Sequence, residues 1–280
     1  MLDKPLPTLN AWTEALIEAD IPVLPSSVSE VALLSEVEEA RSNVDAHMLV
    51  QALSGDPLMT LKVLAHVSRY CTRLSIEPPE TLTGAIVMQG IGPFFTAFGH
   101  MTTVDEALAD LPTAWKGLQR TIRRARRSAH LAVHFAMHRQ DEDAVVIQQA
   151  ALLHDFAEML MWCNHPVLME QVEQRLAQDH TQRSGVIQKQ VLNVTLDELA
   201  QSLMHAWQLP DLLIRCTDDR HADDPKVRTV MLAVRVARHT QYGWDTPNAQ
   251  AALPDDAEDV AELLNISKDA AMRKIHDLDH

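Results

Sequence analysis

Helix-start signals recur along this chain, and they constrain the fold more than any other feature. Asp56-Pro57 joins a capping aspartate to a proline suited to the first helical turn, and Thr195 with Glu198 has the spacing of a capping box. Apolar residues follow these signals at intervals of three and four, which is the helical period. Glycines number only 8 and aromatic residues 4%, whereas sheets need more of both for turns and packing. The sequence therefore predicts an all-α protein.

The expected helices of the first half are short and closely spaced. Ser27 with Glu30 predicts a capping box at the end of a loop over residues 21–30, and a helix follows it. Gly90 and Gly92 are expected to interrupt a later helix. Further helices are expected over residues 42–55, 57–70, 81–90, 93–98, 114–138, 144–163, 166–179, 195–207, 211–217 and 227–241, with a tail helix capped at residues 254–258.

The formal net charge of −15 bounds the partners of this protein. Nonspecific nucleic-acid binding relies on lysines and arginines that neutralise phosphates, so nucleic acid is an unfavoured partner. The basic run Arg120–Arg127 is predicted to form a solvated helix face. Residues 259–275 look a little like a helix-turn-helix, but the segment is acidic, which favours a helix pair packed on the protein body.

Cysteine usage indicates a reducing environment. Cys71, Cys163 and Cys216 are far apart and form no paired motif, so we expect them to fill the core. The first residues lack the apolar stretch of a signal peptide, and no run approaches the length of a membrane span. We therefore expect a cytoplasmic protein that does not interact with a membrane.

One dipeptide carries metal-binding chemistry. His154 and Asp155 are adjacent in an otherwise apolar segment over residues 144–163, which is predicted to form a single helix. An imidazole and a carboxylate together suit divalent transition metals. A carboxylate on an apolar helix face is costly unless it is paired or bound to a metal. The dipeptide therefore raises the question of whether the rest of the chain completes a metal site.

Five segments occur in an order that is similar to one known family. They are Ile21-Pro-Val-Leu-Pro-Ser-Ser-Val28, Leu53-Ser-Gly-Asp-Pro-Leu-Met-Thr-Leu-Lys-Val-Leu64, Thr81-Leu-Thr-Gly-Ala-Ile-Val-Met-Gln-Gly-Ile91, the segment around His154-Asp155, and Leu203-Met-His-Ala-Trp-Gln-Leu-Pro210. With this order the chain resembles, over residues 15–245, the HDOD family, the HD-related output domains of bacterial signalling proteins. The resemblance implies a multi-helix fold related to HD phosphohydrolases. The expected parts are an N-terminal extension at 1–14, an N-terminal helical subdomain at 15–112, an HD-like subdomain at 113–245 and a helical tail at 246–280.

What the resemblance implies about activity depends on three positions of the HD pattern. The family is regulatory and generally thought to lack hydrolase activity. Arg127 stands where the pattern has its first histidine, Arg238 where it has its final aspartate, and Leu196 where many relatives have a further histidine. A guanidinium stays protonated and cannot bind a metal under ordinary conditions. The resemblance therefore implies a degenerate HD site, a pseudoenzyme with no expected metal cofactor, in which Asp155 pairs with Arg127 or Arg238.

Three functions stay open at this point. The leading prediction is a non-catalytic signal-transduction protein that acts through contacts with protein partners. The second is a metal-dependent phosphohydrolase that uses Fe, Mn or Zn to act on a nucleotide or a cyclic dinucleotide. The third is a sensor that binds a small anion or a nucleotide in the remnant pocket. The sequence also does not decide whether the protein forms a homodimer.

The hydrolase alternative requires additional metal ligands. His130 or His134 would have to converge with Asp218 or Asp219 on the His154-Asp155 pair, because a hydrolytic metal needs several protein ligands and an open position for water. Other histidines are expected to have no such role, namely His205 in the packed core and His221 in a solvated loop.

Overall fold

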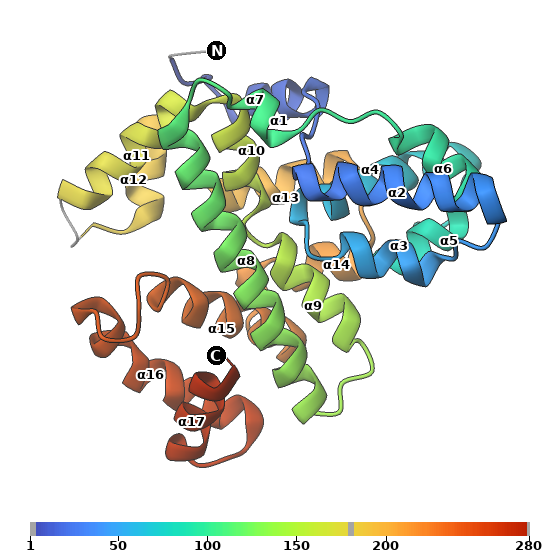
Figure 1. Cartoon of the computed structure of the whole chain (residues 1–280). Helices are drawn as coiled ribbons and strands as arrows, with labels where there is room; N and C mark the ends of the chain where they lie inside the picture. The colour runs from blue at the N-terminus through green and yellow to red at the C-terminus, as the bar shows by residue number, and fades with distance from the viewer. Residues whose placement is uncertain (1–3, 179–181, 279–280) are drawn as a thin grey trace. The chain divides into compact units, whose positions relative to one another are not determined.

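The regular structure of this protein is helical (Figure 1). The computed structural model describes residues 4–178 and 182–278, and within these ranges it contains no β-strand, only an isolated bridge between Val23 and Thr103. The prediction of an all-α fold is confirmed. Among the same residues, no helix combines the length and the apolar character that crossing a bilayer would require.

The helices belong to two compact units, which we describe separately. The first unit lies within residues 1–121 and 155–210, and the second lies within residues 122–154 and 211–280. Each unit is therefore built from segments that are far apart in the sequence, and one boundary falls inside helix α8 (Pro112–His138). The sequential domain limits expected from the sequence stay predictions.

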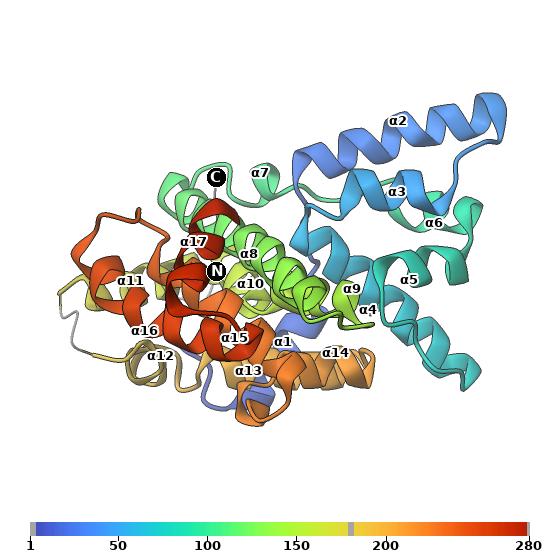
Figure 2. The same ribbon diagram turned by 90° about the horizontal axis from the view of Figure 1, so that it is seen from below.

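The first unit contains two groups of helices. Its helices are α1 (Leu9–Glu18), α2 (Pro25–Arg41), α3 (Ala46–Leu53), α4 (Pro57–Leu74), α5 (Leu82–Gln89), α6 (Ile91–Phe98), α7 (Val104–Ala107), α10 (Phe156–Asn164), α11 (Pro166–Gln178), α12 (Ser184–Leu192) and α13 (Leu196–Ala206), with residues 112–121 of α8. In one group α2 packs on α3 and α6, and α5 packs on α3, α4 and α6. Figures 1 and 2 both show α2 beside α3. In the other group α13 packs on α1 and α10, and α10 also contacts α4, which joins the two groups.

Asp56 caps α4 and ties it to the start of α2. Its Oδ1 accepts hydrogen bonds from the backbone N–H groups of Leu58 at 2.9 Å and Met59 at 3.1 Å. Its Oδ2 accepts from the N–H of Leu24 at 2.8 Å and from the hydroxyl of Ser27 at 2.7 Å. Asp56 is only 3% exposed, and a buried carboxylate is tolerated because such donors replace water. The Asp-Pro signal thus marks both a helix start and a tertiary contact.

The predicted capping box at Ser27 and Glu30 is wrong. Helix α2 begins at Pro25, so both residues lie inside the helix, and the capping residue Leu24 makes no side-chain hydrogen bond. Proline suits the first helical position because its φ angle is already helical and its missing N–H would have no partner there. The Ser27 hydroxyl is instead bound to Asp56.

Trp12 anchors the second group of the first unit. Its side chain is fully buried, and its indole N–H donates to the carbonyl oxygen of Leu192 at 2.8 Å. The ring of His165 contacts Trp12 edge-on, with the two ring centroids 4.9 Å apart. A buried indole N–H needs such an acceptor, so these contacts fix α1 against the end of α12. Helices α1, α7 and α12 are absent from the helices predicted from the sequence.

Helix α15 is the centre of the second unit. The unit contains residues 122–138 of α8, α9 (Ala144–Leu153), α14 (Asp211–Cys216), the 3-10 helix η1 (Asp219–His221), α15 (Pro225–His239), α16 (Pro247–Leu264) and α17 (Lys268–Leu278). Helix α15 contacts α9, α14, η1 and α16, and α16 packs along α17. Most of these helices match the predicted ones. In the first unit, the helix predicted over residues 166–179 was expected to end at Asp179, which lies outside the described residues.

The start of the tail differs from its prediction. Helix α16 begins at Pro247, and the Thr246 side chain accepts a hydrogen bond from the N–H of Ala249 at 3.3 Å. Pro254, which is predicted to begin the tail helix, lies inside α16. The pair Thr246-Pro247 is the same cap-and-proline signal as Asp56-Pro57, and it precedes Pro254 by two turns. The helix pair expected over residues 259–275 is present, because α16 ends at Leu264 and α17 begins at Lys268.

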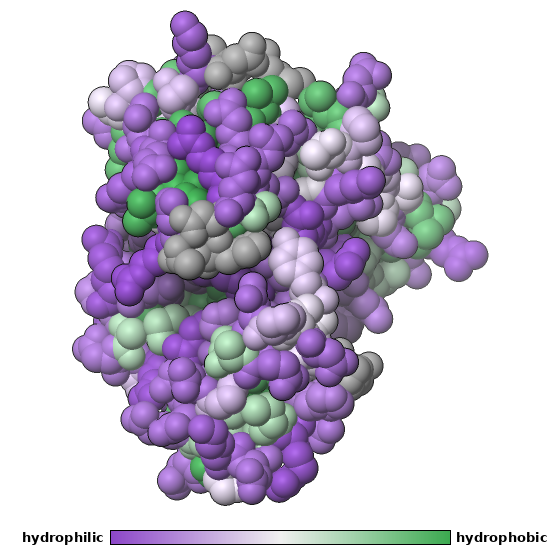
Figure 3. Space-filling view, turned by 90° about the vertical axis from the view of Figure 1, so that its left-hand side faces the viewer, coloured by the Kyte–Doolittle hydropathy of each residue, from purple (hydrophilic) through white to green (hydrophobic). Residues whose placement is uncertain are grey.

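The surface and the core divide as the helical pattern predicts. Hydrophilic residues cover most of the face seen in Figure 3, and hydrophobic residues form small separate areas on it. Cys71, Cys163 and Cys216 are buried and free, which confirms that they fill the core. Burial raises the pKa of the Cys163 and Cys216 thiols to about 12, so neither is a reactive thiolate near neutral pH.

Candidate functional site

The His154-Asp155 dipeptide lies at a break between two helices. Helix α9 ends at Leu153 and α10 begins at Phe156, so the prediction of one helix over residues 144–163 is wrong. The break is at Asp155, whose ψ angle of 20° departs from the helical value. The short polar side chain of aspartate favours such helix ends over helix interiors. The boundary between the two compact units along the sequence also falls here, because His154 belongs to the second unit and Asp155 to the first.

His154 is a buried histidine with a carboxylate neighbour. It is 8% exposed, and its Nε2 lies 3.2 Å from Oδ1 of Asp219 on η1. The Asp219 side chain is 47% exposed, so this carboxylate connects a buried imidazole to solvent. The hydrolase alternative requires either Asp218 or Asp219 beside His154, and the structure places Asp219 there.

Asp218, the other aspartate in question, has different partners. Arg220 donates to it through Nε at 2.8 Å and through Nη2 at 2.7 Å, in a two-pronged contact. The Arg220 guanidinium lowers the pKa of the Asp218 carboxyl, which therefore stays ionised. His221 is exposed, with its Nε2 3.6 Å from the same carboxylate. His221 is exposed as expected, but its segment forms the 3-10 helix η1 and Asp218 is only 8% exposed, so the expectation of a solvated loop is correct only in part.

Arg127 is held at the C-terminal end of α15. Its Nη2 donates to Oγ1 of Thr240 at 2.5 Å, and its Nη1 donates to the carbonyl oxygen of Ala237 at 3.4 Å. A positive charge is stabilised there because carbonyl groups at a helix C-terminus carry partial negative charge. The Arg127 guanidinium is therefore bound within the second unit, and its correspondence to the first histidine of the HD pattern stays a prediction.

The other pattern positions also hold residues that cannot bind a metal. Arg238 is an exposed residue of α15, and Leu196 is a buried residue, 7% exposed, at the start of α13. Arg127, Arg238 and Asp155 each make at least one further interaction, so none of them is isolated. Asp155 belongs to the first unit and both arginines to the second. The pairing of Asp155 with Arg127 or Arg238 stays a prediction.

His130 and His134 form a pair on α8. Their ring centroids are 4.6 Å apart in an edge-on arrangement, as the four-residue spacing on a helix allows. His130 is exposed and His134 is half-buried. Burial, and then the charges of His130 and Lys274, lower the pKa of His134. The electrostatic neighbour of this pair is thus Lys274 of α17.

Two expectations, one about His205 and one about the basic run over residues 120–127, are wrong. His205 is exposed, because α13 buries the face that carries Leu199, Leu203 and Met204 and leaves His205 on the other side. The basic run over residues 120–127 is also not a uniformly solvated face. Arg123 and Arg126 are exposed, but Arg124 is only 7% exposed and donates to the side-chain oxygen of Gln241 at 3.2 Å, and Arg127 is bound at the end of α15.

The side chains at this site do not fit a hydrolytic metal centre. Within residues 4–178 and 182–278, no three histidine, cysteine, aspartate or glutamate side chains come together in a way that could hold an ion. In the second unit His154 meets Asp219, and the Arg127 guanidinium, which is expected at the first-histidine position of the HD pattern, donates to Thr240. A catalytic metal usually has three protein ligands and an open position for water.

Sequence reasoning missed one polar cluster of the second unit. Asp256 of α16 is 1% exposed and accepts from Arg235 Nε at 2.7 Å and His239 Nδ1 at 2.6 Å. Arg235 also donates to Asp259. The sequence does show acidic residues in the segment of α16 and Arg235 and His239 in the segment of α15. It does not show which of them face one another, because that depends on how the two helices pack.

Comparison with known proteins identifies the family. The model of the HDOD domain matches residues 21–223. A virulence factor from Campylobacter jejuni has a similar solved structure, with a TM-score of 0.65 and 21% identity over 94% of this chain and 92% of that one. The MmoQ response regulator from Methylococcus capsulatus has a TM-score of 0.60 and 18% identity over 88% and 98%. No match was found among curated proteins. The matched residues make up most of the sequence, and the chain therefore belongs to the HDOD family.

Proposed function

We propose that this protein is a non-catalytic signal-transduction protein that acts through contacts with protein partners. The observation that carries the proposal is the binding of the Arg127 guanidinium to Thr240 and Ala237. A group that is always protonated stands where a metal-binding histidine would be needed. The second unit is stabilised by that charge, so the site supports a structural role better than a hydrolytic one.

The comparisons support the signalling part of this proposal. The chain belongs to the HDOD family, whose resemblance led us to expect a regulatory role, and the similar structure from Methylococcus capsulatus is described as a response regulator.

A metal-dependent phosphohydrolase is the second candidate. One observation favours it, namely the 3.2 Å contact between His154 Nε2 and Asp219 Oδ1, which joins two potential ligands. The same contact also serves a structural role, because a buried imidazole needs a hydrogen-bond partner. Direct measurement of bound metal separates the two candidates.

Metal analysis tests the proposal. Protein purified without chelator is analysed for Fe, Mn and Zn, and hydrolysis of bis(p-nitrophenyl) phosphate is measured with added Mn²⁺. We expect far less than one ion per chain and no metal-dependent hydrolysis. Near-stoichiometric metal that is lost in His154→Ala and retained in His205→Ala, an exposed histidine of the other unit, would overturn the proposal.

The predicted ion pair at Asp155 provides a second measurement. If Asp155 pairs with Arg127, both of which are half-buried, Asp155→Ala lowers the free energy of unfolding by roughly 1–3 kcal/mol, whereas a pair with the exposed Arg238 contributes less than about 1 kcal/mol. Asp223→Ala, which removes an exposed carboxylate of the second unit, is the control and is expected to cost less than about 1 kcal/mol. An unchanged melting temperature of Asp155→Ala would rule out the pairing with Arg127.

A further inference from the structure

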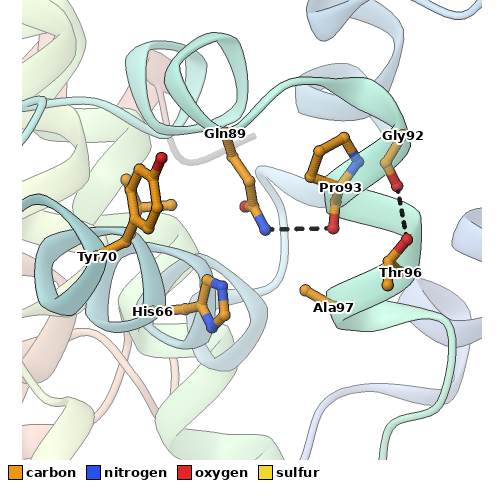
Figure 4. A pocket seen from close by; sticks show the side chains of 8 residues that line it. His66, Tyr70, Gln89, Gly92, Pro93, Thr96 and Ala97 are labelled. Atoms are coloured by element: carbon orange, nitrogen blue, oxygen red, sulfur yellow. Dashed lines mark hydrogen bonds between the residues drawn. The ribbon is translucent and has the colours of Figure 1, made fainter.

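The first unit contains a pocket of about 750 Å³ between α4 and the α5–α6 segment (Figure 4). This volume lies within the range of small-molecule sites in proteins. The pocket lies within one compact unit and includes none of the residues of the HD pattern. The residues that line it are His66, Val67, Tyr70, Gln89, Gly92, Pro93, Thr96 and Ala97.

The α6 wall of the pocket is largely apolar and is open to solvent. It is made of Gly92, Pro93, Thr96 and Ala97, which have short side chains and are all exposed. The one hydroxyl among them, that of Thr96, donates to the carbonyl oxygen of Gly92 at 3.1 Å. An added Cβ at Gly92 would meet no atom within 4 Å, so the helix leaves empty space at that position. A ligand can therefore enter from solvent and lie against this wall without displacing a side chain.

The α4 wall presents two rings one turn apart. His66 and Tyr70 lie at positions i and i+4, and Figure 4 shows them across the space from Pro93 and Ala97. Tyr70 is 43% exposed, and Leu74, one turn further along α4, is 53% exposed. Covering exposed apolar groups of this size is favourable, because it removes their surface from water. The two walls thus favour a ligand with an apolar body.

Two arginines extend along α4 beside these rings. The Nε of Arg69 donates to the carbonyl oxygen of Ala65 at 3.2 Å, and the Nε of Arg73 donates to that of Arg69 at 3.3 Å. Each side chain therefore runs back over the preceding helical turn, as long side chains on helices do. The Arg69 guanidinium thus lies at the turn that carries His66, and the Arg73 guanidinium lies at the turn that carries Tyr70.

No carboxylate of the described chain neutralises these two arginines. Within residues 4–178 and 182–278, Arg69 and Arg73 form no ion pair, and their Nη groups donate no hydrogen bond. Both residues are exposed, so the Nη groups can be reached from solvent. In a chain with a formal net charge of −15, a pair of cations without a carboxylate partner is a local exception.

The positive charge of the two arginines acts on the pocket itself. Burial, and then the charges of Arg69 and Arg73, lower the pKa of His66, which lines the pocket. The imidazole is therefore neutral at neutral pH, and the two guanidinium groups are the cations beside the pocket. Acidic residues elsewhere in the chain oppose an anion only weakly, because salt screens exposed charges beyond about 8 Å.

We propose that this pocket binds a small carboxylic acid with an apolar body. The body lies against Tyr70 and the short side chains of α6, and the carboxylate accepts hydrogen bonds from the Nη groups of Arg69 and Arg73. A guanidinium suits this role because its parallel N–H donors match the two oxygens of a carboxylate. The proposal does not rest on the proposed signalling function, because it concerns a different part of the chain.

Two probes that differ in charge test the proposal. 2-Naphthoate and 2-naphthamide have the same ring system and nearly the same shape, but only the acid is negatively charged at neutral pH. Their dissociation constants for the full-length protein are measured by titration in ligand-observed NMR. We expect 2-naphthoate to bind about three- to tenfold more tightly, the size of effect that one or two exposed ion pairs produce. The preference should shrink as salt is added.

Two outcomes of this titration would overturn the proposal. One is absence of binding by both probes at millimolar concentration. The other is equal binding of the two probes, which would leave the pocket as an apolar surface suited to a side chain of a protein partner.

Charge variants locate the carboxylate. The double variant Arg69→Gln and Arg73→Gln changes only exposed side chains, so it should fold normally. We expect it to bind the two probes equally, with the affinity for 2-naphthamide unchanged. Arg175→Gln, which removes a positive charge from an exposed position of α11, is the control and should keep the preference for the acid. A preference that survives in the double variant would contradict the assignment of the two arginines.

A space-filling variant locates the apolar body. Gly92→Phe places a ring in the empty space beside α6, and it is expected to abolish binding of both probes. Gly55→Phe is the matched control, because an added Cβ at Gly55 also meets nothing within 4 Å but lies outside the pocket. Binding of 2-naphthoate that survives in Gly92→Phe would show that the acid binds elsewhere.

Discussion

Gly117 of α8 and Trp162 of α10 meet at close range inside the first unit. A Cβ on residue 117 would lie 2.5, 2.6 and 2.7 Å from three ring carbons of Trp162, far below normal contact distance. Trp162 is fully buried, so its ring has no room to move away. The glycine is required here for space and not for backbone freedom, because it lies within a helix.

We expect Gly117→Ala to lower the free energy of unfolding by about 1–2 kcal/mol. Overpacking a core costs about 1–3 kcal/mol, and the higher helix propensity of alanine returns up to about 1 kcal/mol. Urea unfolding followed by circular dichroism measures the difference. Gly92→Ala is the control, since its Cβ meets nothing, and it should be neutral or stabilising. A Gly117→Ala variant as stable as the wild type would show that the Trp162 ring can move.

At the scale of elements, α15 and α16 are joined by the cluster around Asp256. The Asp256 carboxylate is 1% exposed, whereas the Arg235 and His239 side chains that bind it are 32% and 34% exposed. Partial exposure of the two cations screens their charges and reduces what each contact contributes. The carboxylate is the buried centre of the cluster, so it is the residue on which α16 packing depends.

Asp256→Ala is expected to destabilise the second unit by roughly 2–3 kcal/mol, less than a fully buried pair because the cations reach water. Loss of the carboxylate should loosen α16 and α17 first, so their amide hydrogens should exchange faster. Hydrogen-exchange mass spectrometry measures this segment by segment. Asp255→Ala, at an exposed neighbouring aspartate, is the control and should leave exchange unchanged. Equal exchange in the two variants would show that the cluster does not hold α16 in place.

At the scale of the whole molecule, local signals predicted most of the helices. Asp56-Pro57 and the Thr195–Glu198 box are found where the sequence places them, because caps depend on residues only three apart. The family resemblance is confirmed by the match over residues 21–223. These features depend on short-range chemistry or on order along the chain.

The remaining features depend on tertiary contacts that the sequence does not display. Ser27 looks like a cap but binds Asp56, which is 29 residues away. The apolar run around His154-Asp155 reads as one helix, yet the chain breaks at Asp155. The partners of Arg127 at the end of α15 and the empty space beside Gly92 follow from helix packing, so periodicity alone could not reveal them.

The response of overall stability to acid should depend in part on His165. The residue is 7% exposed, and burial lowers the pKa of its imidazole from the ordinary value of 6.5. Below pH 6.5 the unfolded chain binds a proton that the folded protein does not. Its contribution to stability is therefore complete above pH 6.5 and is lost as the pH falls from 6.5 toward the lowered pKa.

We expect His165→Phe to make the fall in unfolding free energy below pH 6.5 shallower by up to about 1.4 kcal/mol per pH unit, the limit for one proton. Phenylalanine keeps a ring against Trp12 and removes the Nδ1 atom, which is buried without a hydrogen-bond partner. Urea unfolding between pH 5 and 7.5 provides the measurement. His205→Gln, at an exposed histidine of the same unit, should retain the wild-type slope. If His165→Phe also retains that slope, the His165 imidazole is protonated within the folded protein and does not limit its stability in acid.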